Sequence, residues 1–185
     1  MYREEFLRAI SLLAEAFEEV SKQGHPRPVL VGGAVVELHV GSAMASGDFD
    51  ILYEMPEVLR ETLGHHGFQP SLSNPHAAMM NLETGMAVEF VKGPLFDGRS
   101  DRSRLVLYMF ENGSILVPPI EDMIADRMGQ DTSAPRGVPM MREQAVALYK
   151  LAENLDLDYL DKRIRQESAN EHKLATLREW ADEAG

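Results

Sequence analysis

The sequence predicts an α+β protein in which helices flank a mixed β-sheet and a small C-terminal helical unit follows. Three observations support this class. Strand-like and helix-like segments alternate over residues 29–117, every segment after residue 139 has helical periodicity, and a segment rich in proline, glycine and small polar residues separates the two parts. We therefore expect a core over residues 1–130, a linker over 131–139 and a helical unit over 140–185.

The first elements follow from the spacing of apolar residues. Residues 3–22 predict an amphipathic helix, because apolar side chains recur every three or four positions, at Phe6, Ile10, Leu13, Phe17 and Val20. Residues 29–33, VLVGG, predict a buried strand that ends in a glycine turn, and residues 34–41 predict a helix that begins there. Residues 48–54, DFDILYE, predict a second strand.

Later elements are bounded by proline and glycine. Pro56 begins a short helix that ends near Gly64. We expect two hairpins after it, one around the ETG sequence at 83–85 and one turned at Asn112–Gly113. A proline pair at 118–119 precedes a further helix, and the segments after the linker are all helical.

Composition excludes several classes of protein. The chain has 185 residues and no cysteine, which excludes disulfides, thiolate catalysis and cysteine-based zinc sites. Its net charge of −12 argues against broad, non-specific binding of nucleic acid but suits a protein that gathers divalent cations at one point. No apolar run approaches the roughly 18 residues that span a bilayer, and the N-terminus is charged and periodic, unlike a secretory signal. We expect a cytoplasmic protein without a membrane partner.

Two carboxylates on one strand are the first candidate functional residues. Side chains two positions apart on a strand share a face, so Asp48 and Asp50 project together, opposite to Phe49. Such close charges repel unless a cation lies between them, and Mg²⁺ prefers oxygen ligands. Glu89, inside the apolar segment MAVEFVKG, would complete a triad able to hold two metals if its strand lies beside the first. Aspartates that cap turns and a Glu89 that faces water explain the same pattern.

A glycine pair, Gly32–Gly33, stands between the first strand and the following helix. Backbone N–H groups at such a turn can bind phosphate oxygens at the positive end of a helix, and tight packing explains the pair equally well. The combination of strand, Gly-Gly, helix and then Ser46-Gly-Asp-Phe-Asp is more specific. It resembles the DNA-polymerase-β-like nucleotidyltransferase superfamily, whose hallmark is a Gly-Gly or Gly-Ser turn followed by a strand with two alternating aspartates. The segment looks most like small prokaryotic AbiE-type toxins and related uncharacterised proteins.

The resemblance implies transfer of a nucleotidyl group from an NTP to a hydroxyl acceptor such as a tRNA end, a protein or a small molecule. Asp48, Asp50 and Glu89 are then the catalytic residues and the ligands of Mg²⁺ or Mn²⁺. A toxin of a toxin–antitoxin pair is one form of this function, and it would add an antitoxin as a partner.

The same resemblance implies four nucleotide-binding residues: Gly32, Gly33, Ser46 and Arg127. The glycines correspond to the family's phosphate-binding turn. Ser46 stands where the family usually has threonine. Arg127 follows Asp122 by five residues, at the position of a family lysine that contacts the phosphates.

The sequence departs from the family pattern after the linker. AbiE-type enzymes carry a further segment with two acids, and here Val146 stands where the second acid is expected. Together with the replacements at Ser46 and Arg127, this favours an alternative: a catalytically degenerate module on the same fold that binds a nucleotide or a partner. A third interpretation is an α+β interaction protein whose acids bind no metal.

Overall fold

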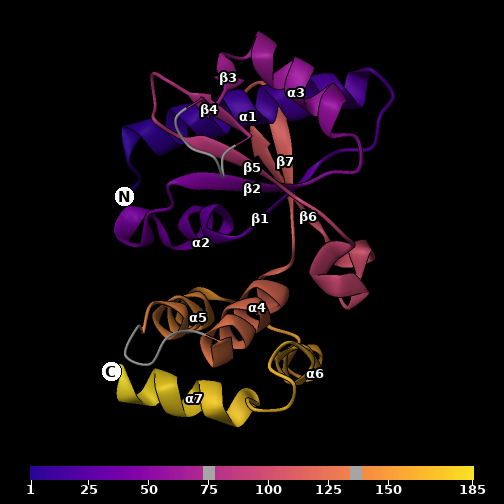
Figure 1. The fold of residues 1–185 in the computed structure, drawn as a ribbon. Helices are drawn as coiled ribbons and strands as arrows, with labels where there is room; N and C mark the ends of the chain where they lie inside the picture. Colours follow the sequence, from indigo (N-terminus) through magenta and orange to yellow (C-terminus); the bar gives the residue numbers. More distant parts are fainter. Residues whose placement is uncertain (73–77, 134–138) are drawn as a thin grey trace. The chain divides into compact units, whose positions relative to one another are not determined.

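A computed structural model describes residues 1–72, 78–133 and 139–185. Its contacts divide the chain into two compact units (Figure 1). The first unit consists of residues 1–94 and 105–118 and contains the β-sheet. The second consists of residues 95–104 and 119–185 and is helical wherever it has regular structure in the described residues. The predicted α+β class is therefore confirmed.

The last boundary between the units falls at residue 118, whereas the sequence placed it at residue 130, and residues 95–104 of the expected core also belong to the second unit. The difference is due to α4 (Ile120–Ser133), which packs against α5 (Met140–Leu151) and α6 (Leu157–Glu167). Of the expected linker 131–139, residues 131–133 belong to α4, and residues 134–138 lie outside the described residues.

The sheet of the first unit has seven strands in the order β3-β4-β5-β2-β1-β7-β6. β1 pairs in parallel with β7, and β2 with β5, while the other neighbours are antiparallel, so the sheet is mixed as predicted. The strands are β1 (Val29–Val31), β2 (Asp48–Leu52), β3 (Phe68–Pro70), β4 (Met79–Asn81), β5 (Ala87–Val91), β6 (Val106–Phe110) and β7 (Gly113–Val117). β3 was not predicted from the sequence.

Helices cover both faces of this sheet. α1 (Glu4–Lys22) and α3 (Pro56–His65) lie on one face, and α2 (Gly33–Val40) lies on the other (Figure 1). The predicted apolar stripe of α1 is completely buried, and the ring of Phe6 lies 6.0 Å from the ring of Phe49 on β2. A short 3₁₀ helix, η1 (Ser42–Met44), connects α2 to β2.

Both predicted hairpins form. In the β4–β5 hairpin the buried side chain of Asn81 accepts hydrogen bonds from the backbone N–H groups of Glu83 and Thr84. The β6–β7 turn is Glu111–Asn112, one residue earlier than predicted, because Gly113 already belongs to β7.

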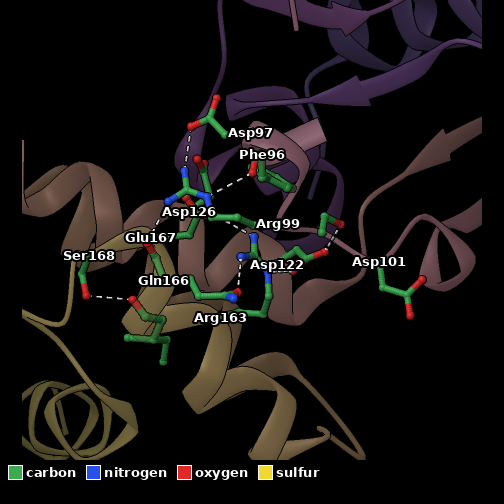
Figure 2. A network of polar contacts seen from close by, with 12 residues as sticks. Phe96, Asp97, Arg99, Asp101, Asp122, Asp126, Arg163, Gln166, Glu167 and Ser168 are labelled. Atoms are coloured by element: carbon green, nitrogen blue, oxygen red, sulfur yellow. Dashed lines mark hydrogen bonds and ion pairs between the residues drawn. The ribbon is translucent and has the colours of Figure 1, made fainter. Parts of the chain in front are cut away.

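The second unit consists of α4–α6, α7 (Leu174–Glu183) and two short 3₁₀ helices, η2 (Leu95–Gly98) and η3 (Arg102–Arg104). A charge network joins α4, α6 and the segment around η2 (Figure 2). The completely buried guanidinium of Arg163 donates from Nε to Oδ1 of Asp122 at 2.5 Å. Arg99 donates from Nη1 to the carbonyl oxygen of Gln166 at 2.8 Å. Residues 95–104 are thereby fixed to the C-terminal helices.

Over the described ranges, no helix combines the length and the apolar composition needed to cross a membrane.

Candidate active site

The turn between β1 and α2 is the first part of the candidate site. Gly32 has φ +73° and ψ −153°, a conformation that is essentially restricted to glycine. A Cβ atom on Gly32 would lie 1.9 Å from Oδ2 of Asp50. The backbone of the glycine turn therefore touches this carboxylate directly.

The acids of β2 and β5 lie on one face of the sheet. Asp48 and Asp50 alternate with Phe49 and Ile51, which are completely buried on the face that α1 covers. Asp50 is the register partner of Glu89 in the parallel β2–β5 pair. Register partners project to the same side of a sheet, so the three predicted acids share a face, and it is the face on which α2 lies.

Ser46 connects the turn to the first acid. Its hydroxyl lies 3.0 Å from the carbonyl oxygen of Asp48 and 3.2 Å from Oδ1 of the same residue. A Cβ atom on Gly33 would lie 2.9 Å from the Ser46 hydroxyl oxygen. Contacts thus connect Gly32 with Asp50, and Gly33 with Ser46, which in turn contacts Asp48. Glu89 is placed beside Asp50 by strand register alone.

Arg127, the remaining predicted residue, belongs to the second unit. It is nearly buried in α4, where it donates to Oδ2 of Asp126 from Nε at 3.0 Å and to Oε1 of Gln144 from Nη1 at 3.3 Å. Its guanidinium is therefore already paired within its own unit. The expected contact between Arg127 and a nucleotide phosphate stays a prediction.

The donor set suits a hard divalent cation in its chemistry. Carboxylate oxygens are the ligands that Mg²⁺ prefers, and protein sites usually bind it through one or two carboxylates, with substrate phosphates and water as further ligands. In the described part of the chain, no three His, Asp or Glu side chains are gathered closely enough to hold a metal on their own. The predicted triad of Asp48, Asp50 and Glu89 is therefore not gathered into a metal site by its own side chains, and a cation bound there would need further ligands such as phosphate oxygens.

Two further residues, Arg3 and Glu37, border this site and were missed by the sequence analysis. Glu37 lies in α2, and burial alone would raise the pKa of its carboxyl group. Hydrogen bonds from Arg3, Ser42 and the backbone N–H of Ser46 outweigh this effect and leave the pKa below its ordinary value. Glu37 is therefore ionised at neutral pH, inside an apolar helix. A single acid within the apolar segment AVVELHV was the signal that could have revealed it.

Comparisons with known proteins support the fold. The sequence matches no protein-family model and has no significant match among curated proteins. The structure, however, is similar to the crystal structure of an antigenic nucleotidyltransferase-like protein from Paracoccidioides brasiliensis. The TM-score is 0.61 at 10% sequence identity, over 98% of this chain and 94% of that chain. This chain has a nucleotidyltransferase-like fold. At such low identity the likeness concerns the fold alone, so the activity has to be argued from the site.

Proposed function

We propose that this protein is a metal-dependent nucleotidyltransferase that transfers a nucleoside monophosphate from an NTP to a hydroxyl acceptor. The acceptor oxygen bonds to the α-phosphorus, the bond from the α-phosphorus to the bridging oxygen breaks, and pyrophosphate leaves. The observation that carries the proposal is the contact between the Gly32 backbone and the carboxylate of Asp50, whose register partner is Glu89. The glycine turn and two adjacent acids therefore lie next to one another, with Asp50 against Gly32 and Glu89 opposite Asp50. A triphosphate with its divalent cation needs both kinds of group at once.

The residues would divide the work as follows. Asp48 and Asp50 hold Mg²⁺ or Mn²⁺, and backbone N–H groups of Gly32 and Gly33 bind phosphate oxygens. The bound cation supplies charge neutralisation at the phosphates and a lower pKa for the acceptor hydroxyl. Glu89 would hold a cation on the acceptor side and receive the proton of that hydroxyl. Positioning and charge account for the rate, so no nucleophilic side chain is required.

A second candidate function is a module that binds a nucleotide or a partner on this fold without turnover. The paired state of Arg127 favours it, since Asp126 and Gln144 already accept the hydrogen bonds that a phosphate would take. Val146, at the place of an expected acid, is nearly buried in α5.

The proposal extends to the setting of the reaction. The acceptor is a tRNA end, a protein or a small molecule, and the protein acts in the cytoplasm, where NTPs are available. An AbiE-type toxin paired with an antitoxin is the specific form that the sequence resemblance suggests. Co-expression with the product of a neighbouring gene, followed by a growth assay, tests that form.

A labelling experiment tests the activity. The protein is incubated with NTPs labelled at the α-phosphate, Mg²⁺ or Mn²⁺, and total RNA or cell lysate, alongside calorimetry with each NTP. We expect Asp50→Asn to lower transfer by about 100-fold or more. The matched control Glu111→Gln changes an exposed acid of the β6–β7 turn and should act like the wild type. Binding without transfer would favour the second candidate. Neither binding nor transfer would refute the proposed enzyme and the nucleotide-binding form of the second candidate.

A further inference from the structure

Glu37 is an acid in an otherwise apolar stretch of α2, and its side chain has no exposed surface. Its carboxylate accepts hydrogen bonds from Nε and Nη2 of Arg3 at 3.0 and 2.8 Å. It also accepts hydrogen bonds from the hydroxyl of Ser42 and from the backbone N–H of Ser46, the latter at 2.7 Å. Both carboxylate oxygens are thus bonded, and one of the partners carries the opposite charge, which makes burial of this acid tolerable.

Arg3 also holds the other side of the Ser46 backbone. Its Nη2 donates to the carbonyl oxygen of Ser46 at 2.6 Å. The Arg3–Glu37 pair therefore binds both polar backbone groups of Ser46, which lies just before β2 begins at Asp48. Arg3, which precedes α1, and Glu37 of α2 therefore fix the position of the backbone just before β2 begins.

The position of Ser46 in turn affects the candidate active site, because Ser46 contacts residues on both sides of that site. Its hydroxyl contacts Asp48, and a Cβ atom on Gly33 would lie 2.9 Å from the hydroxyl oxygen. Ser46 thus separates the glycine turn from the first acid of β2. A shift of about 1 Å in such a spacing can cost about 100-fold in rate.

We propose that Arg3 and Glu37 are positioning residues that set the distance between the phosphate-binding turn and Asp48. This inference rests on the proposed function, because it assigns the pair a role in that reaction. Both residues bond the backbone of Ser46, and neither is among the residues proposed to bind the nucleotide or its cation. Their substitution should therefore change the rate of transfer more than the affinity for NTP.

The experiment compares Arg3→Gln, Glu37→Gln and Arg3→Lys with the wild type. The control, Arg8→Gln, removes another arginine near the chain start, which pairs with Glu83 on the surface. Each variant is assayed for label transfer, and for NTP affinity by calorimetry in Mg²⁺, at a temperature where thermal denaturation finds it folded. We expect Arg3→Gln and Glu37→Gln to lower kcat by about 10- to 100-fold with little change in KM. Arg3→Lys should recover part of the rate, and Arg8→Gln should equal the wild type.

Three results would overturn the inference and are distinguishable. If the wild type transfers label and the folded Arg3→Gln and Glu37→Gln variants match it in kcat, the pair is a structural support only, and the proposed function stands. If the wild type neither binds NTP nor transfers label, the proposed function fails and the positioning role fails with it. A wild type that binds NTP without transfer also overturns a role in setting kcat.

Discussion

The substitution Gly32→Ala probes the contact on which the candidate site depends. A methyl group at this position would lie 1.9 Å from Oδ2 and 2.8 Å from Cγ of Asp50, far inside the van der Waals contact distance. The backbone of Gly32 also has φ +73° and ψ −153°, which an alanine adopts only under strain. The new side chain therefore changes both the folding energy and the position of the acid.

The two effects have separate magnitudes. Backbone strain of this kind costs about 1–3 kcal/mol. For a chain of this length each kcal/mol lowers the thermal midpoint by about 2–4 °C, so we expect a decrease of roughly 2–12 °C. The carboxylate of Asp50 must move by more than an ångström to avoid the methyl group, and a misplacement of about 1 Å can cost about 100-fold in rate. Transfer should therefore fall by about 100-fold or more in protein that is still folded.

Thermal denaturation and label transfer, measured on the same preparation, test both parts. Gly47→Ala is the matched control, since a Cβ atom there would meet no heavy atom within 4 Å. It should leave the midpoint and the transfer rate close to those of the wild type. A folded Gly32→Ala protein that transfers label at the wild-type rate would refute the assignment of this turn to the active site.

Three other predictions address charges elsewhere in the chain. Arg163→Leu should destabilise the second unit by about 3–5 kcal/mol in chemical denaturation, because it leaves the buried carboxylate of Asp122 without its arginine. A loss of stability below about 1 kcal/mol would contradict this prediction. Glu89→Gln removes a like charge opposite Asp50 and should add about 0.2–1 kcal/mol to the free energy of unfolding measured in EDTA. The same substitution should reduce the stabilisation that Mg²⁺ and NTP together give. An unchanged response to Mg²⁺ with NTP would count against Glu89 as a ligand. A hydrogen bond from His65, opposed by burial, lowers the pKa of Glu19 below its ordinary value of 4.5. The resulting stabilisation is present above pH 4.5 and is lost as the pH falls through the lowered pKa. The difference in unfolding free energy between the wild type and Glu19→Gln should therefore shrink in acid. A constant difference from pH 7 to 3 would refute this prediction.

Local patterns in the sequence were sufficient to predict most of the helices and strands and to place Asp48 and Asp50 on one face of β2. The stripe of α1 and the alternation of β2 depend on residues within a few positions of one another, so periodicity reveals them. Glu89 was identified because an acid inside an apolar strand needs a reason. Its pairing with Asp50 had to be assumed, since strand order depends on contacts between distant segments.

What the sequence could not reveal depends on such distant contacts. Glu37 had the same signal as Glu89, but its partner Arg3 lies 34 positions away in a different element. The assignment of α4 to the second unit likewise involves Asp122 and Arg163, which are 41 positions apart. In both cases the sequence contains an acid among apolar residues and gives no indication of which arginine neutralises it.

Gly113 illustrates how a correct local prediction can have a different cause. The Asn-Gly pair predicted a hairpin turn, in which glycine supplies a positive φ. The glycine instead lies in β7, and a Cβ atom on it would come within 2.2 Å of the carbonyl oxygen of Ala14. Close approach of α1 to the sheet, and not the turn, requires glycine here.

The treatment of internal acids separates the candidate site from the rest of the fold. Glu37 and Asp122 are buried in helices, and each is paired with an arginine, Arg3 in one case and Arg163 in the other. Glu89 lies in a strand whose preceding residues are buried, directly beside Asp50, yet no arginine, lysine or histidine forms an ion pair with it in the described residues. Two adjacent carboxylates repel unless a positive charge approaches them. Pairing with an arginine explains how Glu37 and Asp122 are tolerated inside the protein. It does not explain Glu89, which in the proposed function contacts the cation that accompanies the substrate.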